Sequence, residues 1–276
     1  MRQVNITVII PVKNEEKNLP RCLNMLEQFN QVMVIDSGST DRTPDIVKEF
    51  GAEYYLFEWD GQFPKKRNWA LRNLDIKNDW VLYLDADEII SEAFIREIEK
   101  KTKNDAVNGF WLIYKNYFMG KKLNYGDVFT KLALFRLGTG EYEYIDEHSW
   151  SFLDMEVHEH PIVKGKIGKI KSPIDHNDFR GLEQYISRHN DYSTWEANRF
   201  MALTKEDFKH FTRRQRIKYN LMRIGCLPSF YFFGAYFLRL GILDGSVGFY
   251  LARYKANYFL QIQTKIIELK RLKKMP

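Results

Sequence analysis

The segment Trp80–Leu84 constrains the fold most, because it is a short apolar run that ends in Asp85, Asp87 and Glu88. A strand presents alternate side chains on one face, so Asp85 and Asp87 leave its end in the same direction. Ligands of open parallel α/β sheets bind at that end of the strands. Two adjacent carboxylates suit Mg²⁺ or Mn²⁺, and substrate phosphates usually complete the coordination shell of these ions. Alternatively, Asp87 and Glu88 cap a helix that starts near Ser91.

Strand and helix patterns alternate along the first ninety residues. Apolar runs predict strands, and apolar residues at helical spacing, with Asn18 as one N-cap, predict the helices between them. The expected strands are Val4–Val12, Gln31–Ile35, Glu53–Phe57 and Trp80–Leu84, and the expected helices start near Asn18 and cover Thr43–Phe50 and Phe63–Leu74. This alternation predicts an α/β fold with a doubly wound, mostly parallel sheet.

The later sequence changes character twice. A helix over Glu92–Lys101 and strands over Gly109–Phe118 and Lys131–Arg136 follow, with antiparallel pairing expected because Met119–Leu123 is similar to a hairpin link. Residues 138–180 are rich in loops, and the pattern from Leu182 onward is helical. We therefore expect a catalytic domain over 1–180 and a helical C-terminal region over 181–276.

Composition favours an ordinary soluble protein, with 45% hydrophobic and 28% charged residues. Cys22 and Cys226 are far apart and lack metal-ligand spacing, which indicates a reducing compartment such as the cytoplasm. The N-terminus runs directly into a strand pattern, so no signal peptide is expected. The longest apolar stretch, Cys226–Leu238, is interrupted by Pro228 and Gly234 and is too short to span a bilayer.

Polar side chains follow three of the expected strands. Asn14 and Glu15 follow the first, Asp36 and Asp41 the second, and the paired carboxylates the fourth. A rim of carboxylates and turn residues suits a nucleotide, and we assign Asp36 to a ribose hydroxyl or a base N–H. The other interpretation of Asp36–Asp41 is a tight turn in which Asp41 caps the next helix.

A basic run, Lys65, Lys66 and Arg67, precedes Asn68 at the start of the third helix. Such a run is usually a solvated face. Basic side chains near a helix N-terminus and a metal-binding strand end would also meet a pyrophosphate. The sequence leaves both interpretations open.

Four segments, Ile9–Glu15, Asp36–Asp41, Lys66–Leu71 and Leu84–Glu88, together resemble the family 2 glycosyltransferases in order and spacing. Val157–Glu159 is similar to the branch that includes lipopolysaccharide core glucosyltransferases. The resemblance extends to about residue 190. It implies a GT-A fold, a nucleotide-sugar donor, a divalent metal at the Asp-x-Asp, and inversion at the anomeric carbon.

The resemblance also implies a set of site residues. Those expected to line the nucleotide-sugar are Pro11, Val12, Asn14, Glu15, Asp36, Lys66, Arg67, Asn68, Asp85 and Ala86. Asp87 is expected to bind the metal, and His176 is the histidine that best fits a further ligand, although a loop histidine is more often simply hydrogen bonded. Lys66 departs from the branch, in which Gln is frequent, so its contact with the diphosphate is an open question.

Inversion requires a general base to take the proton of the acceptor hydroxyl. The metal neutralises charge that develops on the leaving diphosphate. The acidic segment Asp154–His160 lies where the family places its acceptor-side acid. Glu159 is the expected base through its match to the Val-His-Glu pattern, followed by Glu156 and then Asp154.

The C-terminal region combines basic and aromatic residues on the expected helices Leu182–Phe200, Phe208–Ile224 and Phe249–Lys274, in a chain of net charge +6. Such helices suit an anionic membrane surface. The alternative is that these aromatic residues pack on the catalytic domain. We expect a peripheral protein on the cytoplasmic face of the cell membrane.

The sequence thus predicts an inverting, metal-dependent transferase that moves a hexose from a UDP-sugar to a lipopolysaccharide, surface-polysaccharide or lipid-linked acceptor. A sugar-phosphate nucleotidyltransferase is disfavoured because Pro11–Glu15 contains no glycine. A non-catalytic, membrane-associated protein that binds glycan or a partner is the alternative. Nucleic acid is not expected as a partner, since no binding motif for it is visible.

Overall fold

A computed structural model describes residues 3–126, 129–147, 150–151, 153–154 and 160–274. The chain divides into two compact units. Unit 1 comprises Met1–Gly120, Val128–Asp146 and Phe152–Phe179, and unit 2 comprises Lys121–Asp127, Glu147–Ser151 and Arg180–Pro276.

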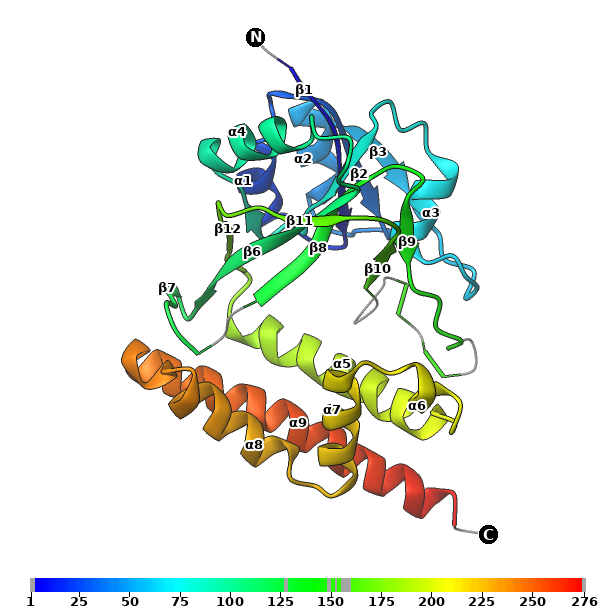
Figure 1. Ribbon diagram of the computed structural model, residues 1–276, viewed down its shortest axis with the longest axis vertical. Coiled ribbons are helices and arrows are strands. Elements are labelled where there is room, and N and C mark those ends of the chain that lie inside the picture. Colours follow the sequence, from blue (N-terminus) through cyan, green and yellow to red (C-terminus); the bar gives the residue numbers. More distant parts are fainter. Residues whose placement is uncertain (1–2, 127–128, 148–149, 152, 155–159, 275–276) are drawn as a thin grey trace. The chain divides into compact units, whose positions relative to one another are not determined.

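Unit 1 is built on one large sheet (Figure 1). Its strands are β1 (Val4–Val12), β2 (Phe29–Asp36), β3 (Glu53–Leu56), β4 (Trp80–Tyr83), β5 (Glu88–Ile89), β6 (Gly109–Phe118), β8 (Phe129–Arg136), β9 (Gly140–Tyr142), β10 (Pro161–Val163), β11 (Ile167–Lys169) and β12 (Ile174–His176). Its helices are α1 (Leu19–Leu23), α2 (Thr43–Phe50), α3 (Lys66–Asn73) and α4 (Glu92–Lys101). β9 and β10 form a separate antiparallel pair.

The main sheet has the order β3-β2-β1-β4-β8-β6-β12-β5, with β11 also paired to β6. The first four strands are parallel, whereas β8 is antiparallel to both β4 and β6. Val12 pairs with Asp36 and Ile9 pairs with Tyr83, which brings the carboxyl ends of β1, β2 and β4 to one edge. The predicted parallel sheet with later antiparallel strands is confirmed.

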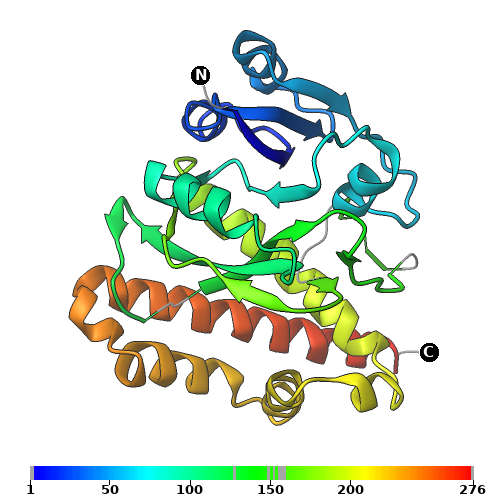
Figure 2. The same cartoon turned by 45° about the horizontal axis from the view of Figure 1, so that its top comes forward.

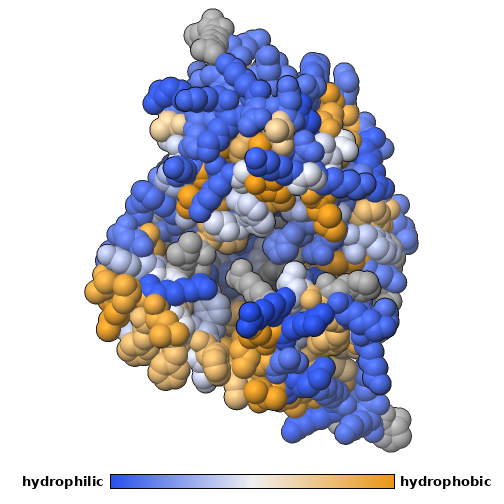
Figure 3. Space-filling model, viewed as in Figure 1, coloured by the Kyte–Doolittle hydropathy of each residue, from blue (hydrophilic) through white to orange (hydrophobic). Residues whose placement is uncertain are grey.

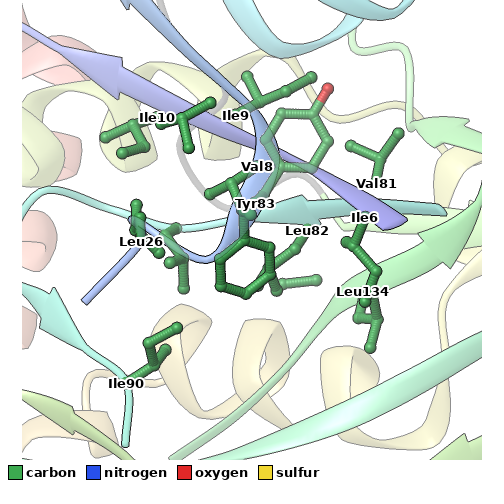
Figure 4. Packing of buried hydrophobic residues seen from close by; sticks show 14 of the residues in the cluster. Ile6, Val8, Ile9, Ile10, Leu26, Val81, Leu82, Tyr83, Ile90 and Leu134 are labelled. Atoms are coloured by element: carbon green, nitrogen blue, oxygen red, sulfur yellow. The ribbon is translucent and has the colours of Figure 1, made fainter. Parts of the chain in front are cut away.

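The core of unit 1 follows from the sequence of β1 and β4, which are apolar on both faces, as expected for strands inside a covered parallel sheet. Val8, Ile9 and Ile10 are fully buried, and Val81 and Leu82 of β4 lie beside them (Figure 4). This packing fixes the strand ends that carry the acidic residues.

Three local predictions are corrected. The helix after Asn18 ends at Leu23, and the Asn18 side chain binds the Glu15 carboxylate instead of capping. The predicted helix Phe63–Leu74 begins only at Lys66, the residue after the extended Lys65. The N-cap of α4 is Ser91, whose Oγ accepts from the Phe94 amide at 3.3 Å. Glu88 belongs to β5, so the interpretation of the acidic residues as the cap of this helix is wrong.

Unit 2 is mainly helical. Its elements are β7 (Lys121–Lys122), α5 (Leu182–Ala202), α6 (Asp207–His210), α7 (Arg213–Arg223), α8 (Leu227–Phe233), the π-helix η1 (Gly234–Leu238), the 3-10 helix η2 (Gly241–Asp244) and α9 (Ser246–Leu272). The predicted single helix Phe208–Ile224 is two helices, because Thr212 caps α7 through a reciprocal capping box with Gln215. Helix α9 runs beside α5 and α8 (Figures 1 and 2).

A second core lies between these helices. Ala197 of α5, Tyr219 and Met222 of α7, and Ile262 and Ile266 of α9 are buried together. None of the helices in the described part of the chain is long and apolar enough to cross a membrane.

Candidate active site

The loops after β1 and β2 are hydrogen bonded to each other at the carboxyl edge of the sheet. The Asn14 amide donates to Ser39 Oγ at 2.7 Å, and the Thr40 amide donates to Asn14 Oδ1 at 2.8 Å. Asn14 has a positive φ of 55°, a conformation that Asn adopts more readily than most residues. The two loops therefore form one rim.

Asp36 lies under this rim and is fully buried. Its carboxylate accepts from the Ser39 amide, from Ser39 Oγ at 2.6 Å and from the Tyr54 hydroxyl at 2.9 Å. Burial and the Asp36 carboxylate raise the pKa of Tyr54 to about 12, which keeps its hydroxyl a donor. In this structure Asp36 orders the loop, and its predicted contact with ribose or base stays a prediction.

Asp41 lies in the expected turn, but the N-cap of α2 is Arg42, so the expectation that Asp41 caps this helix is corrected. Its carboxylate accepts from the Thr43 amide at 3.0 Å and from the Glu16 amide at 3.1 Å. Burial alone would raise the pKa of Asp41, but the hydrogen bonds from Thr43 and Glu16 bring it below its ordinary value. Asp41 therefore stabilises the start of α2.

Asp85 is held by two cations. Arg67 Nη2 lies 2.8 Å from its Oδ1, and Lys131 Nζ contacts its Oδ2. Lys131 also lies 2.6 Å from Oε1 of the buried Glu88, whose Oε2 accepts from the Asp85 amide. Burial acts to raise the pKa of Asp85, but Lys131 and Arg67 outweigh it, so Asp85 stays ionised.

The pKa of Glu88 is shifted in the opposite direction to that of Asp85. Its side chain is fully buried, and this burial raises its pKa to about 7 despite the charge of Lys131. Lys131 is the member of this cluster that the sequence did not indicate. It reaches the acids because β8 pairs with β4, a register that no local pattern shows.

Asp87 and His176, the two residues that the sequence analysis expects to bind a metal, lie close together. His176 Nε2 is 3.4 Å from Asp87 Oδ2, and His176 Nδ1 is 3.1 Å from Asn116 Oδ1. His176 lies on β12, between β5 and β6, so it is not the loop residue that the sequence indicated. Burial lowers the pKa of His176, but the carboxylate of Asp87 more than compensates.

This pair fits a divalent metal. Two donors in adjacent positions of an octahedron with bonds of about 2.1 Å lie about 3 Å apart, close to the observed separation. With Nδ1–H donating to Asn116 Oδ1, loss of the Nε2 proton would make the Nε2 lone pair available to a metal held beside Asp87, which is the usual arrangement of a histidine ligand. Within the described ranges no group of three or more acidic, His or Cys side chains could hold a metal. Two protein ligands are enough for Mg²⁺ or Mn²⁺ when substrate phosphates supply further ligands.

The basic run at the start of α3 is buried, so its interpretation as a solvated face is wrong. Lys65, Lys66 and Arg67 are 4%, 1% and 7% exposed. Lys66 Nζ donates to the Val12 carbonyl at 3.0 Å and lies 3.5 Å from Asp154 Oδ2. Burial lowers the pKa of Lys66, and the charge of Asp154 offsets part of that effect.

Several other predicted residues have clear structural contacts. Asn68 is buried and hydrogen bonded to both the N–H and the carbonyl of Tyr142. Pro11 pairs with Ile35 between β1 and β2, and Ala86 is buried between the two aspartates. Their contacts with a nucleotide-sugar stay predictions.

The predicted general bases cannot be placed in the same way. Glu159 and Glu156 lie outside the described residues. Asp154, the third candidate, is described: burial would raise its pKa, but Lys66 brings it below the ordinary value. A carboxylate paired with a buried ammonium is a poor proton acceptor.

The Lys66–Asp154 pair leads to a testable prediction. Lys66→Met removes the donor to the Val12 carbonyl and leaves the partly buried Asp154 without its cation, so unfolding should require about 2–3 kcal/mol less free energy. Lys66→Gln keeps an N–H donor, so its free energy of unfolding should decrease by less. Urea denaturation of both variants measures the difference. Equal stabilities of the two variants would contradict the importance of the donor to Val12.

The mostly parallel sheet with a carboxylate-rich edge belongs to the α/β class, and the comparison with known families identifies the family. The profile of glycosyl transferase family 2 matches residues 7–152, more than half of the chain. The chain belongs to this family and is a glycosyltransferase. The GT-A fold and the enzyme class implied by the sequence motifs are thereby confirmed.

The similarity to individual proteins extends beyond residues 7–152. The lipopolysaccharide core biosynthesis glycosyltransferase LpsC of Rhizobium meliloti (strain 1021) is 28% identical over 282 residues, which cover 98% of this chain and 95% of that protein. An uncharacterised glycosyltransferase of Rickettsia conorii is 26% identical over 88% of this chain and 83% of its own length.

Solved structures give weaker similarities. Residues 1–349 of S. aureus TarS in complex with UDP-GlcNAc are 16% identical, with a TM-score of 0.46 over 98% of this chain and 92% of that one. Glucosyl-3-phosphoglycerate synthase of Mycobacterium tuberculosis with Mn²⁺ and UDP has a TM-score of 0.32 at 22% identity, covering 43% of this chain and 45% of that one.

Proposed function

We propose that this glycosyltransferase moves a hexose from a UDP-sugar to a lipopolysaccharide, surface-polysaccharide or lipid-linked acceptor, with inversion and with Mg²⁺ or Mn²⁺. The observation that carries the proposal is the Asp87–His176 pair at the carboxyl edge of the sheet. Support for the acceptor class is the similarity to LpsC, which extends along nearly the whole of both chains.

Asp87 Oδ2 and His176 Nε2 would hold the metal, and Asn116 would orient the histidine ring. When bound, the metal would neutralise charge that develops on the leaving diphosphate. Arg67 and Lys131 hold Asp85 in one orientation, so its position is fixed before the donor arrives. Such preorganisation lowers the cost of ordering the site during the reaction.

The nucleotide would lie along the rim formed by the loops after β1 and β2. Pro11 and Val12 end β1, and Asn14 and Glu15 lie in the loop that follows. Asp36 ends β2 and holds the second loop through Ser39. Glu159, with Glu156 as the alternative, would take the proton of the acceptor hydroxyl.

Thermal unfolding with nucleoside diphosphates tests the donor site without an acceptor. UDP with Mn²⁺ should raise the melting temperature, because a ligand that binds the native state stabilises it by mass action. UDP without metal should give a smaller shift, and GDP, dTDP and CMP little or none. The same series on Asp87→Asn should lose the dependence on metal.

The result also separates the two functional alternatives. If none of the nucleotides changes the melting temperature but the protein still binds glycan, the non-catalytic binding protein would be favoured. A shift with GDP or dTDP in place of UDP would keep the transferase but change its donor.

A further inference from the structure

Unit 2 exposes a group of large apolar side chains from the end of α7 through α8, η1 and η2 into the first turns of α9. We name this surface the apolar tip. Its members are Ile224, Phe230, Phe233, Phe237, Leu238, Leu240, Ile242, Leu243, Phe249 and Tyr250, each between 37% and 84% exposed. Figure 3 shows the apolar surface gathered over this end of unit 2, at the lower left.

The aromatic residues of unit 2 fall into two groups that the sequence did not distinguish. Phe208 and Phe211 pack against Tyr219 in the core of the unit. Phe230, Phe233 and Phe237 instead lie at helical spacing on one exposed face of α8 and η1. Packing therefore accounts for the first group and leaves the second without an explanation.

The fold holds the apolar tip in place. Asp244 is buried and accepts from the amides of Asn124 and Tyr125, both at 3.0 Å. Gly248 lets α9 start close against η2, since a Cβ there would lie 2.0 Å from the Gly241 carbonyl oxygen. These contacts fix the backbone that carries the apolar tip, so the exposure of its side chains is a stable feature of the fold.

The exposed charges within the segment that carries the apolar tip, and directly at its two ends, have one sign. From Ile224 to Ala252 the sequence contains two charged residues, Arg239 and Asp244. Arg239 is exposed, whereas the carboxylate of Asp244 is buried on backbone amides. Arg223 and Arg253, at the two ends of the segment, are also exposed. Within the described segment 224–252, a large apolar surface with a cation and no exposed acid matches an anionic lipid headgroup layer.

We propose that the apolar tip inserts into the headgroup region of a bilayer containing anionic phospholipid. Phe and Leu side chains would enter the interface, and Arg223, Arg239 and Arg253 would meet lipid phosphates. A second copy of the chain fits less well. A two-fold contact would bring the same patches together and place these arginines near one another without an exposed acid from this segment.

Vesicle flotation of the full chain tests the proposal independently of sugar transfer. We expect flotation with phosphatidylcholine–phosphatidylglycerol vesicles and much less with phosphatidylcholine alone. The double variant Phe233→Ser, Leu238→Ser should bind such vesicles roughly tenfold or more weakly, since each buried apolar side chain contributes substantially. The matched control, Leu260→Ser with Leu272→Ser, removes two exposed apolar residues of α9 outside the tip and should bind normally.

The chain offers its own probe of insertion. Cys226 is exposed beside the tip, whereas Cys22 is buried, so a thiol-reactive, environment-sensitive dye should label Cys226. Its emission should shift to the blue on vesicle binding, and Arg239→Gln should reduce the preference for anionic vesicles. Leu238→Glu, at the most exposed position, provides a single change that should leave folding intact, as checked by the melting temperature.

Two outcomes would overturn the proposal. One is equal vesicle binding by the natural protein and both tip variants. The other is the absence of vesicle binding together with self-association that the tip variants abolish, which would make the tip an interface between copies.

Discussion

Replacing Asp87 with Asn is expected to slow sugar transfer by about 10²–10⁴-fold, because Lewis-acid assistance by a metal contributes several kcal/mol to the barrier. The Asp87 carboxylate lies 3.4 Å from His176 Nε2 and is largely buried. The neutral amide keeps the shape of the side chain but is a much weaker ligand. The melting temperature without metal should change little.

Release of UDP from a UDP-sugar, with and without acceptor, measures the rate, and calorimetry measures the Mn²⁺ dependence of UDP binding. Asp175→Asn is the matched control. Asp175 precedes His176 on β12, so its side chain points to the other face of the strand, where it accepts from the Tyr117 hydroxyl at 3.3 Å. Full activity and unchanged metal dependence in Asp87→Asn would contradict the assignment of the metal site.

Local patterns were enough to predict the framework of unit 1. Continuous apolar runs predicted β1 and β4, and acidic residues directly after a buried strand predicted the functional edge. Asp87 and His176, the two residues expected to bind a metal, lie 3.4 Å apart although 89 positions of sequence separate them, and their role as metal ligands stays a prediction. The strand predictions succeeded because each depended on an apolar run within one short segment.

The predictions that failed depended on long-range packing. The run Lys65–Arg67 is hydrophilic by composition, yet it is buried because the Val12 carbonyl, Asp154 and Asp85 supply partners. Residue type likewise could not show which aromatic residues of unit 2 face the core. Both outcomes depend on neighbours that are distant in sequence.

Lys131→Met is expected to lower the free energy of unfolding by about 3–5 kcal/mol at pH 8, the range found when a buried ion pair loses one partner. Lys131 contacts both Asp85 and Glu88. Arg67 still pairs with Asp85 in the variant, at 2.8 Å in the present structure. The fully buried Glu88 side chain loses the cation at its Oε1, so most of the cost should come from Glu88.

The cost should therefore depend on pH. Glu88 has a pKa of about 7 in the folded protein, above its ordinary value of 4.5, so its protonated form favours folding. That contribution is fully present below pH 4.5 and is lost as the pH rises through 7. Loss of Lys131 raises the folded pKa of Glu88 further, since the ammonium acts to lower it. The difference in stability between the variant and the natural protein should thus be smallest near pH 5 and should grow above pH 7.

Urea denaturation between about pH 5 and pH 9 measures this difference. Arg72→Met is the control, because Arg72 and Glu141 form an exposed pair at 2.5 Å, with side chains 43% and 46% exposed. Exposed pairs contribute about 0–1 kcal/mol, so this variant should be nearly as stable as the natural protein at every pH. A loss of stability in Lys131→Met that is the same at every pH would mean that the cost comes from lost packing and the Asp85 contact. Glu88 would then not be the residue that makes Lys131 necessary.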